Sequence, residues 1–181
     1  MTAANAQRQI LLVTGVPGSG KTTLAGRLAA GLSWSLLSLD SIKEALFTAV
    51  ETPSDSTAID SGLLRRAAEQ VLWSMLEDAD GGTVLDIWVA PDRDDRRVRA
   101  NLLKLNRPVL EVLCLVPPDL AARRYADRVR SGPHRPADRA VLASLRELAI
   151  LIEPLGVGPA RRVHTDRPVD VRPLIDWVQL A

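Results

Sequence analysis

Eight consecutive residues decide the fold of this chain, and they read Gly15-Val16-Pro17-Gly18-Ser19-Gly20-Lys21-Thr22. They match the pattern G-x-x-x-x-G-K-[ST] at every defined position. An apolar run at residues 10–14 precedes them and predicts a buried strand, while an Ala- and Leu-rich segment at residues 21–32 follows and predicts a helix. Glycines let successive backbone N–H groups point at one anion, and the start of the helix adds the positive end of its dipole. The sequence therefore predicts a phosphate-binding loop between a strand and a helix.

Two side chains of this loop have expected roles of their own. Lys21 is expected to bridge the β- and γ-phosphates of ATP, and to be exposed when no nucleotide is bound. The hydroxyl of Thr22 is expected to ligate Mg²⁺. A glycine-rich turn without a ligand is the alternative interpretation. The residues that we expect to bind the nucleotide are Gly15, Pro17, Gly18, Ser19, Gly20, Lys21, Thr22 and Thr23.

Short apolar runs alternate with segments of helical period along the rest of the chain. The remaining expected strands are residues 35–39, 83–88, 109–116 and 162–165. The remaining expected helices are residues 41–50, 63–78, 91–105, 119–129, a segment ending near 152, and 169–180. This alternation is typical of β-α units that build a parallel sheet. We expect an α/β fold and a single domain over residues 1–181.

Composition limits the classes of partner. The chain has 23 basic and 22 acidic side chains, so its net charge does not demand a polyanionic partner or a membrane surface. No apolar stretch approaches the roughly 20 residues that span a bilayer. The lone Cys114 cannot form an internal disulfide and is expected to be buried in a strand. We expect a soluble cytoplasmic protein, and composition predicts nothing about its oligomeric state.

Two aspartates follow expected strands and carry further chemistry. Asp40 comes after the strand at 35–39, where it could accept a proton from an attacking hydroxyl, or could simply cap the helix at 41–50. Asp86 follows an apolar run, as does the acidic residue that orients the Mg²⁺ hydration shell in nucleotide-binding proteins. The alternative for Asp86 is a polar strand end, and a strand that continues to residue 88 would place it before the sheet edge.

Three further segments carry a resemblance to a known group. They are Asp40-Ser41-Ile42-Lys43, the stretch from Asp86 through Pro91-Asp92-Arg93-Asp94-Asp95-Arg96-Arg97, and Val116-Pro117-Pro118-Asp119-Leu120-Ala121-Ala122-Arg123-Arg124-Tyr125-Ala126-Asp127-Arg128. Together with the glycine-rich loop they resemble the P-loop kinases of the zeta-toxin, chloramphenicol phosphotransferase and polynucleotide kinase group. The resemblance implies a three-layer P-loop NTPase fold with a five-stranded parallel sheet in the order 2-3-1-4-5, and a short lid near residues 128–138. It also implies ATP- and Mg²⁺-dependent phosphotransfer with Asp40 as the base.

The resemblance also assigns roles near the lid and the acceptor. Arg124 and Arg128 stand where the group has lid arginines, and four residues apart on one helix they would share a face and clamp the γ-phosphate. A solvated basic helix face is the alternative. Lys43 stands where polynucleotide kinases carry an arginine that meets an acceptor phosphate. Apart from the resemblance, Trp88 follows Asp86 at the strand end and could line the acceptor pocket, and a place in the core is the alternative.

Two other segments are expected near the nucleotide. The resemblance places Arg130, His134 and Arg135 on the lid. The stretch Thr165-Asp166-Arg167-Pro168-Val169-Asp170 resembles the group's adenine-side loop, in which backbone atoms read the base.

The expected function is transfer of the γ-phosphoryl group of ATP to a hydroxyl of a small molecule. A GTPase is not favoured, because a guanine-reading N-K-x-D sequence is absent. A polynucleotide 5′-hydroxyl kinase is the first alternative, but the arginines at 93–99 are interleaved with Asp92, Asp94 and Asp95, so nucleic acid is the less favoured partner. A module that binds or hydrolyses ATP without an acceptor is the second alternative.

Overall fold

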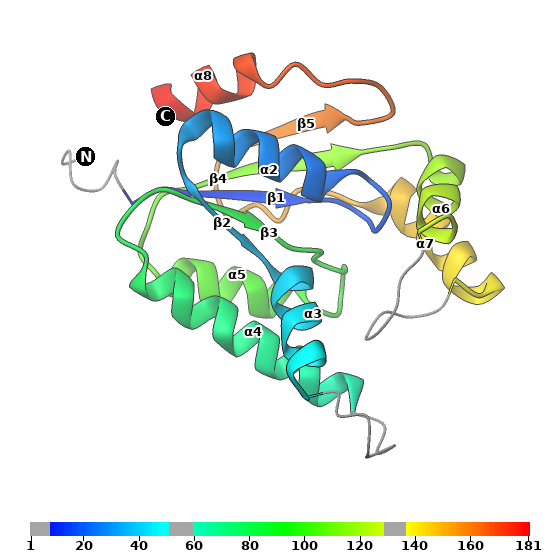
Figure 1. Cartoon of the computed structure of the whole chain (residues 1–181). Coiled ribbons are helices and arrows are strands. Elements are labelled where there is room, and N and C mark those ends of the chain that lie inside the picture. The colour runs from blue at the N-terminus through cyan, green and yellow to red at the C-terminus, as the bar shows by residue number, and fades with distance from the viewer. Residues whose placement is uncertain (1–7, 51–59, 129–136) are drawn as a thin grey trace.

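A parallel five-stranded sheet organises the chain in the computed structural model, which describes residues 8–50, 60–128 and 137–181. Its spatial order is β2-β3-β1-β4-β5, which confirms the α/β fold class and the order implied by the resemblance (Figure 1). Every residue of the central strand β1 is buried, as a parallel strand covered on both faces requires. The strands are β1 (Ile10–Thr14), β2 (Ser35–Ser38), β3 (Thr83–Asp86), β4 (Val109–Leu115) and β5 (Ala160–His164).

Helices cover both faces of the sheet. In Figure 1, α2 and α8 lie on one face, α3, α4 and α5 lie on the other, and α6 and α7 lie beyond one end of the strands. Within the described ranges, no helix is both long and apolar enough to cross a membrane. The helices are α2 (Lys21–Leu32), α3 (Leu39–Val50), α4 (Ser61–Asp78), α5 (Asp95–Lys104), α6 (Pro118–Ala126), α7 (Arg139–Leu151) and α8 (Arg172–Leu180).

The side chains of β1 alternate between two cores. Leu11 and Val13 pack with residues of α2 and α8, including the fully buried Leu28. Ile10 and Leu12 pack toward α4, where Ala68, Leu72 and Leu76 are buried. Burying a leucine side chain of this kind contributes about 1.5–3 kcal/mol. The two cores hold β1 rigidly, and the loop that follows β1 is anchored at its start.

Two aspartates fix where α4 and α7 begin. The Asp60 carboxylate accepts hydrogen bonds from the backbone N–H groups of Gly62 (2.7 Å) and Leu63 (3.2 Å), so α4 starts two residues before the expected position. The Asp138 carboxylate accepts one from Val141 (2.8 Å). Each cap contributes about 1 kcal/mol to helix stability.

Several element ends differ from the sequence prediction. Strand β3 ends at Asp86 and not at residue 88, because its pairing with β1 and β2 ends there, on the register partners Val13 and Ser38. Helix α5 begins at Asp95, since residues 91–94 form a turn in which Asp92 has φ +61°. Helix α6 ends at Ala126, three residues before the expected end at 129.

Two other predictions depend on these differences. Arg128 lies beyond the end of α6, so the expectation that Arg124 and Arg128 share one helix face is wrong. Most of the expected lid at 128–138, including Arg130, His134 and Arg135, lies outside the described residues.

Candidate active site

Three glycines shape the loop between β1 and α2. Gly15, Gly18 and Gly20 have φ of +152°, +85° and +81°, a backbone region that residues with a Cβ rarely adopt. A Cβ on Gly18 would lie 2.3 Å from the carbonyl oxygen of Ala121 in α6. The glycine therefore permits α6 to pack directly against the loop, and this contact carries Arg124 to the site.

A cavity of about 450 Å³ opens beside this loop. It brings together most residues predicted to bind the nucleotide, although Gly15 and Ser19 are buried in the loop and Pro17 lines a different cavity. Lys21 is only 5% exposed, so the expectation that it is exposed in the empty site is wrong. The predicted residues that line this first cavity are Gly18, Gly20, Lys21, Thr22, Thr23, Arg124 and Arg128.

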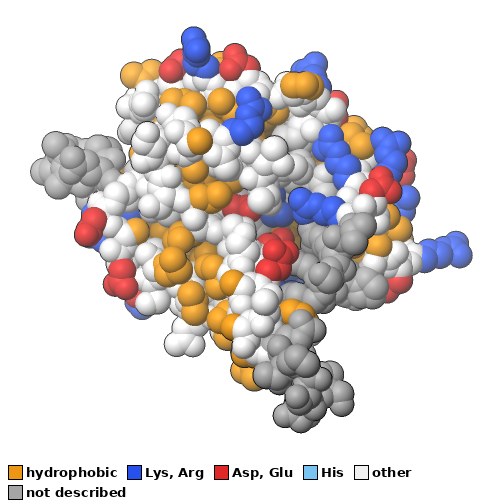
Figure 2. All heavy atoms as spheres, in the orientation of Figure 1, with side chains coloured by type: hydrophobic (Ala, Val, Ile, Leu, Met, Phe, Trp, Pro, Cys, Tyr) orange, Lys and Arg blue, Asp and Glu red, His pale blue; other side chains and the backbone are white. Residues whose placement is uncertain are grey.

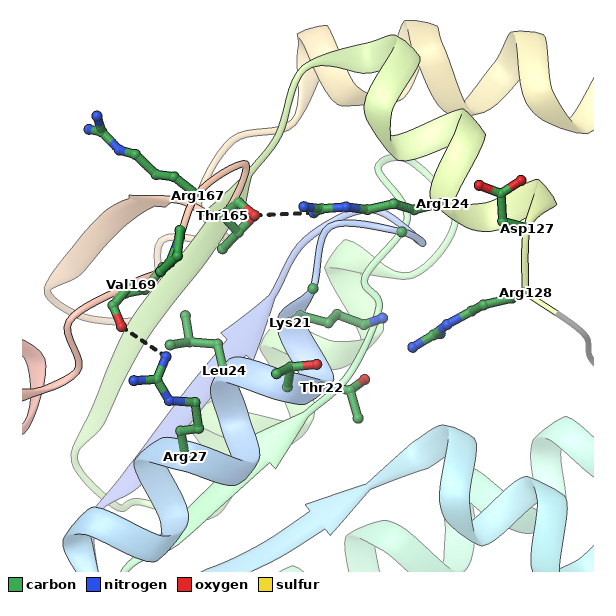
Figure 3. Close-up of a pocket in the computed structure, with 14 residues that line it drawn as sticks. Lys21, Thr22, Leu24, Arg27, Arg124, Asp127, Arg128, Thr165, Arg167 and Val169 are labelled. Carbon is green, nitrogen blue, oxygen red and sulfur yellow. Dashed lines mark hydrogen bonds between the residues drawn. The ribbon is translucent and has the colours of Figure 1, made fainter.

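Positive charge converges on the first cavity. Lys21 and Arg128 extend toward the same space from different sides in Figure 3, and both line the cavity. Figure 2 shows many Lys and Arg side chains on the part of the surface where α6 lies, and few over α3 and α4. Like charges that face the same space repel each other, and a bound polyphosphate would relieve that repulsion.

Thr165 joins the loop to α6 and to the sheet. Its hydroxyl lies 2.5 Å from the carbonyl oxygen of Ser19 and 2.9 Å from that of Leu115, while its own carbonyl accepts a hydrogen bond from Nη1 of Arg124 (3.1 Å; Figure 3). The sequence interpretation named this loop but no side chain in it. The signal available was a hydroxyl residue directly after the last strand.

Three more residues of the predicted adenine-side loop also border the first cavity. Arg167, Pro168 and Val169 line it, and the Val169 carbonyl accepts a hydrogen bond from Nη1 of Arg27 (2.8 Å; Figure 3). This bond ties the loop to α2. Arg27 was not predicted, because nothing in its helical segment distinguishes it from other surface arginines.

Asp86 is buried at the end of β3 with one oxygen unused. Ser38 donates a hydrogen bond to Oδ2 of Asp86 (3.0 Å), whereas Oδ1 is buried and has no hydrogen-bond partner in the described residues. Asp86 is 2% exposed. In the described part of the chain there is no group of three His, Cys, Asp or Glu side chains that could hold a metal by itself. The oxygens present, from Asp86 and Thr22, suit a hard cation that keeps several waters, as Mg²⁺ does.

A second cavity, of about 250 Å³, adjoins the loop on another side. It is lined by the three residues predicted to meet the acceptor, Asp40, Lys43 and Trp88. Lys21 lines both cavities, so the two meet at this lysine. Asp40 lies inside the first turn of α3, which begins at Leu39, and so it does not occupy the cap position of the alternative interpretation.

Two arginines in the second cavity were missed by sequence reasoning. Arg65 of α4 and Arg93, which follows β3, both line it and both bond to Asp94. Burial alone would raise the pKa of Asp94, but hydrogen bonds from Arg93 and Arg65 outweigh burial and hold that pKa below its usual value. Arg65 lies in an amphipathic helix far from every motif, and no sequence signal marks it.

Cys114 is a buried residue of β4, as predicted. Burial raises the pKa of its thiol to about 12, and the positive charge of Lys21 acts in the opposite direction. The Cys114 thiol therefore stays protonated at neutral pH. Its backbone carbonyl lies so close to Gly15 that a Cβ there would be 2.8 Å from the oxygen.

Solved structures with the same fold are numerous, and several span nearly all of this chain. A protein from Chloroflexus aurantiacus, described provisionally as a kinase, is 23% identical with a TM-score of 0.78, covering 95% of this chain and 97% of its own. Shikimate kinase from Bacteroides thetaiotaomicron is 22% identical, with a TM-score of 0.55 and coverage of 95% and 94%. A gluconokinase from Sinorhizobium meliloti is 14% identical, with a TM-score of 0.54 and coverage of 95% and 89%. At these identities the likeness establishes the P-loop NTPase fold.

Sequence comparison assigns the family. No curated protein matches the chain. A family model does match, over residues 10–150, which include the phosphate-binding loop, Asp40, Asp86 and Arg124. Because this match covers well over half of the chain, the protein belongs to the family described as the AAA domain.

Proposed function

We propose that this protein is a P-loop kinase that transfers the γ-phosphoryl group of ATP to a hydroxyl of a small molecule. One observation carries the proposal: Lys21 borders both cavities, and the second cavity contains Asp40. A donor held in the first cavity would present its terminal phosphate where an acceptor in the second cavity could attack it. A module that only hydrolyses ATP would not need the second cavity.

The first cavity supplies the groups that would bind ATP. Backbone N–H groups of the loop and the start of α2 would bind the phosphate oxygens. Lys21 would meet the β- and γ-phosphates, and Arg128 would approach the same phosphates from the side of α6. Fixed positive groups stabilise the charge that develops on the equatorial oxygens during transfer.

Thr22 and Asp86 would hold Mg²⁺, Thr22 through its hydroxyl and Asp86 through its unpartnered Oδ1 or through water. The buried, unused oxygen of Asp86 supports this assignment. When bound, the ion neutralises negative charge on the phosphate oxygens. Ser38 fixes the orientation of the Asp86 carboxylate by donating to its other oxygen.

Asp40 would act as the general base. The acceptor oxygen forms a bond to the γ-phosphorus, the bond from that phosphorus to the β,γ-bridging oxygen breaks, and the acceptor proton passes to the Asp40 carboxylate. ADP leaves with the bonding electron pair. Trp88, partly buried beside Asp40 in the second cavity, would pack against the body of the acceptor.

A transfer assay tests this proposal. The protein is incubated with γ-labelled ATP, Mg²⁺ and a panel of small hydroxyl compounds, with 5′-hydroxyl oligonucleotides in a separate arm. We expect label to appear in a small acceptor in proportion to ADP, and Lys21→Met to abolish both. ATP turnover that no acceptor changes would contradict the proposal, and labelled oligonucleotide as the preferred product would move the acceptor to another class.

A further inference from the structure

A buried carboxylate beside the second cavity gathers three arginines. Asp94 is 2% exposed, and its Oδ1 accepts hydrogen bonds from Nη2 of Arg65 (2.7 Å) and Nη2 of Arg97 (3.1 Å). Its Oδ2 accepts hydrogen bonds from Nη2 of Arg93 (2.7 Å) and from the backbone N–H of Ala90 (3.2 Å). Both oxygens of the Asp94 carboxylate therefore accept their hydrogen bonds from within the protein.

A second buried carboxylate completes the cluster. Glu69, which is 5% exposed, accepts hydrogen bonds from Nε of Arg65 (2.9 Å) and Nη2 of Arg97 (3.1 Å). Two carboxylates therefore hold three guanidinium groups, and one positive charge remains in excess. Several charge-assisted hydrogen bonds to a buried carboxylate hold the guanidinium groups in place.

Two of the three arginines keep donors for a ligand. A guanidinium has five N–H donors, and Arg65 and Arg93 each contact the carboxylates through Nε and Nη2. Across the described ranges no hydrogen bond joins Nη1 of either residue to the protein. Both line the second cavity, whereas Arg97 does not. Their side chains are 29% and 53% exposed, so a ligand can reach them.

Among the described residues, the lining of the second cavity is cationic on an apolar frame. The charged residues of that lining, within residues 8–50, 60–128 and 137–181, are one carboxylate, Asp40, and four cations, Lys21, Lys43, Arg65 and Arg93. Asp94 and Glu69 lie behind the arginines and are already paired, so they do not offer their charge to a ligand. The apolar and aromatic residues of the lining include Leu39, Trp88, Tyr125, Leu145 and Leu148.

We propose that Arg65 and Arg93 bind an anionic group of the acceptor, a carboxylate or a phosphate, so that the substrate is a small, negatively charged hydroxyl compound with an apolar body. This inference rests on the proposed function, because it takes the second cavity to be the acceptor site. Guanidinium groups held in place by buried carboxylates bind a planar or tetrahedral anion without first losing side-chain entropy. A cavity of about 250 Å³ suits a compact molecule.

Binding is measured with a library of small aromatic and alicyclic alcohols, each prepared as carboxylate, phosphate monoester and neutral carboxamide. A non-hydrolysable ATP analogue with Mg²⁺ fills the first cavity, so that anions cannot bind at the phosphate loop. We expect the anionic members to bind roughly tenfold to a hundredfold more tightly than their carboxamides, as charge-assisted hydrogen bonds allow. The ratio between carboxylate and phosphate affinities identifies which anion the site prefers.

Arg97 provides a matched control for the two ligand-facing arginines. Arg93→Gln and Arg65→Gln should each remove most of the preference for anions, while Arg97→Gln should keep it, although all three arginines contact Asp94. Equal binding of carboxamides and anions, no binding by any member of the library, or equal loss of the preference in all three variants would overturn the inference. Tighter binding of a 5′-hydroxyl oligonucleotide than of every small anion would overturn it as well.

The result is separable from that of the transfer assay. Anion binding that depends on Arg65 and Arg93, with no transfer of label to any acceptor, would contradict the kinase assignment and leave the anion site standing. Transfer of label to neutral alcohols as fast as to their anionic partners would support the kinase and contradict the anion site.

Discussion

Ser38 and Asp86 are register partners on neighbouring strands, and the Ser38 hydroxyl donates a hydrogen bond to one Asp86 oxygen at 3.0 Å while the other oxygen is buried without a partner in the described residues. The serine orients the carboxylate and leaves Oδ1 as the oxygen without a partner in the described residues. Residues that orient a metal-binding carboxylate commonly contribute tenfold to a hundredfold in metal affinity. The pair therefore links the sheet register to the proposed Mg²⁺ site.

Ser38→Ala should raise the Mg²⁺ concentration for half-maximal ATP turnover by roughly tenfold to a hundredfold, because Asp86 loses its orienting donor. Ser35→Ala, on the same strand but exposed, is the control and should leave the Mg²⁺ dependence unchanged. The rate of ATP turnover is measured at increasing Mg²⁺ concentration with saturating ATP. An unchanged Mg²⁺ requirement in Ser38→Ala would show that Asp86 is only a polar strand end.

Substitutions of the arginines in and just after α6 should affect ATP turnover differently, depending on whether the arginine lines the first cavity. Arg124→Ala and Arg128→Ala should each slow ATP turnover by about a hundredfold or more with little change in melting temperature, since a charge-stabilising donor is lost. Arg123→Ala, exposed on α6 beside Arg124 and absent from the cavity lining, should behave as the native protein. Equal, small effects of all three substitutions would favour a solvated basic face.

Gly18→Ala should weaken ATP binding at least tenfold. A residue with a Cβ at φ +85° is strained by about 1–2 kcal/mol, and that Cβ would lie 2.3 Å from the Ala121 carbonyl oxygen, so α6 must move away from the loop. Gly26→Ala is the control, because Gly26 lies inside α2 with nothing within 4 Å and alanine is the better helix former. Calorimetric titration with ATP measures the affinity of both variants. A native affinity in Gly18→Ala would contradict the claim that the contact between α6 and the loop shapes the nucleotide site.

The stability of the Asp94 cluster should depend on pH in a defined direction. The pKa of Asp94 is lowered in the folded state, because hydrogen bonds from Arg93 and Arg65 outweigh burial. Its contribution to stability is therefore present above its ordinary pKa, about 3.9, and is lost as the pH falls through the lower folded value. The contribution of Glu111 to stability changes with pH in the opposite direction, because burial raises its pKa. Glu111 is present in both the native protein and Asp94→Asn, so it does not affect the difference between them.

Asp94→Asn should unfold more easily than the native protein at pH 7, and the difference in the free energy of unfolding should shrink as the pH is lowered below about 4. Urea unfolding of both proteins between pH 3 and 7 measures this difference. A difference that stays constant over that range would show that the charge of Asp94 does not stabilise the cluster.

Local patterns in the sequence were enough to predict the phosphate-binding loop, the parallel sheet and most residues of the first cavity. The strand, the glycines and the helix around Lys21 are consecutive, so one motif fixes their mutual geometry. The strand order came from resemblance and not from periodicity. The ends of the strands were less predictable, because β3 ends where its pairing with β1 and β2 ends, and that point depends on the register with Val13 and Ser38.

The second cavity could not be assembled from sequence alone. Asp40 and Trp88 were placed by their positions after strands and Lys43 by the resemblance, whereas Arg65 reaches the cavity from α4 only because α4 packs against the sheet. The acidic residues between the arginines at 93–99 indicated charge neutralisation in the sequence. In the fold, Asp94 turns inward and holds Arg93 at the cavity, so alternation along the chain did not reveal the charge that a ligand would meet.

The measurement that most directly tests the kinase assignment compares ATP affinity and acceptor phosphorylation in native protein and Asp40→Asn, on the same preparations. Asparagine keeps the size of the side chain, so the first cavity and α3 should persist and ATP should bind with native affinity. An amide cannot take up the acceptor proton, so acceptor phosphorylation should fall by roughly two to four orders of magnitude. Native ATP affinity together with near-native phosphorylation in Asp40→Asn would contradict the account.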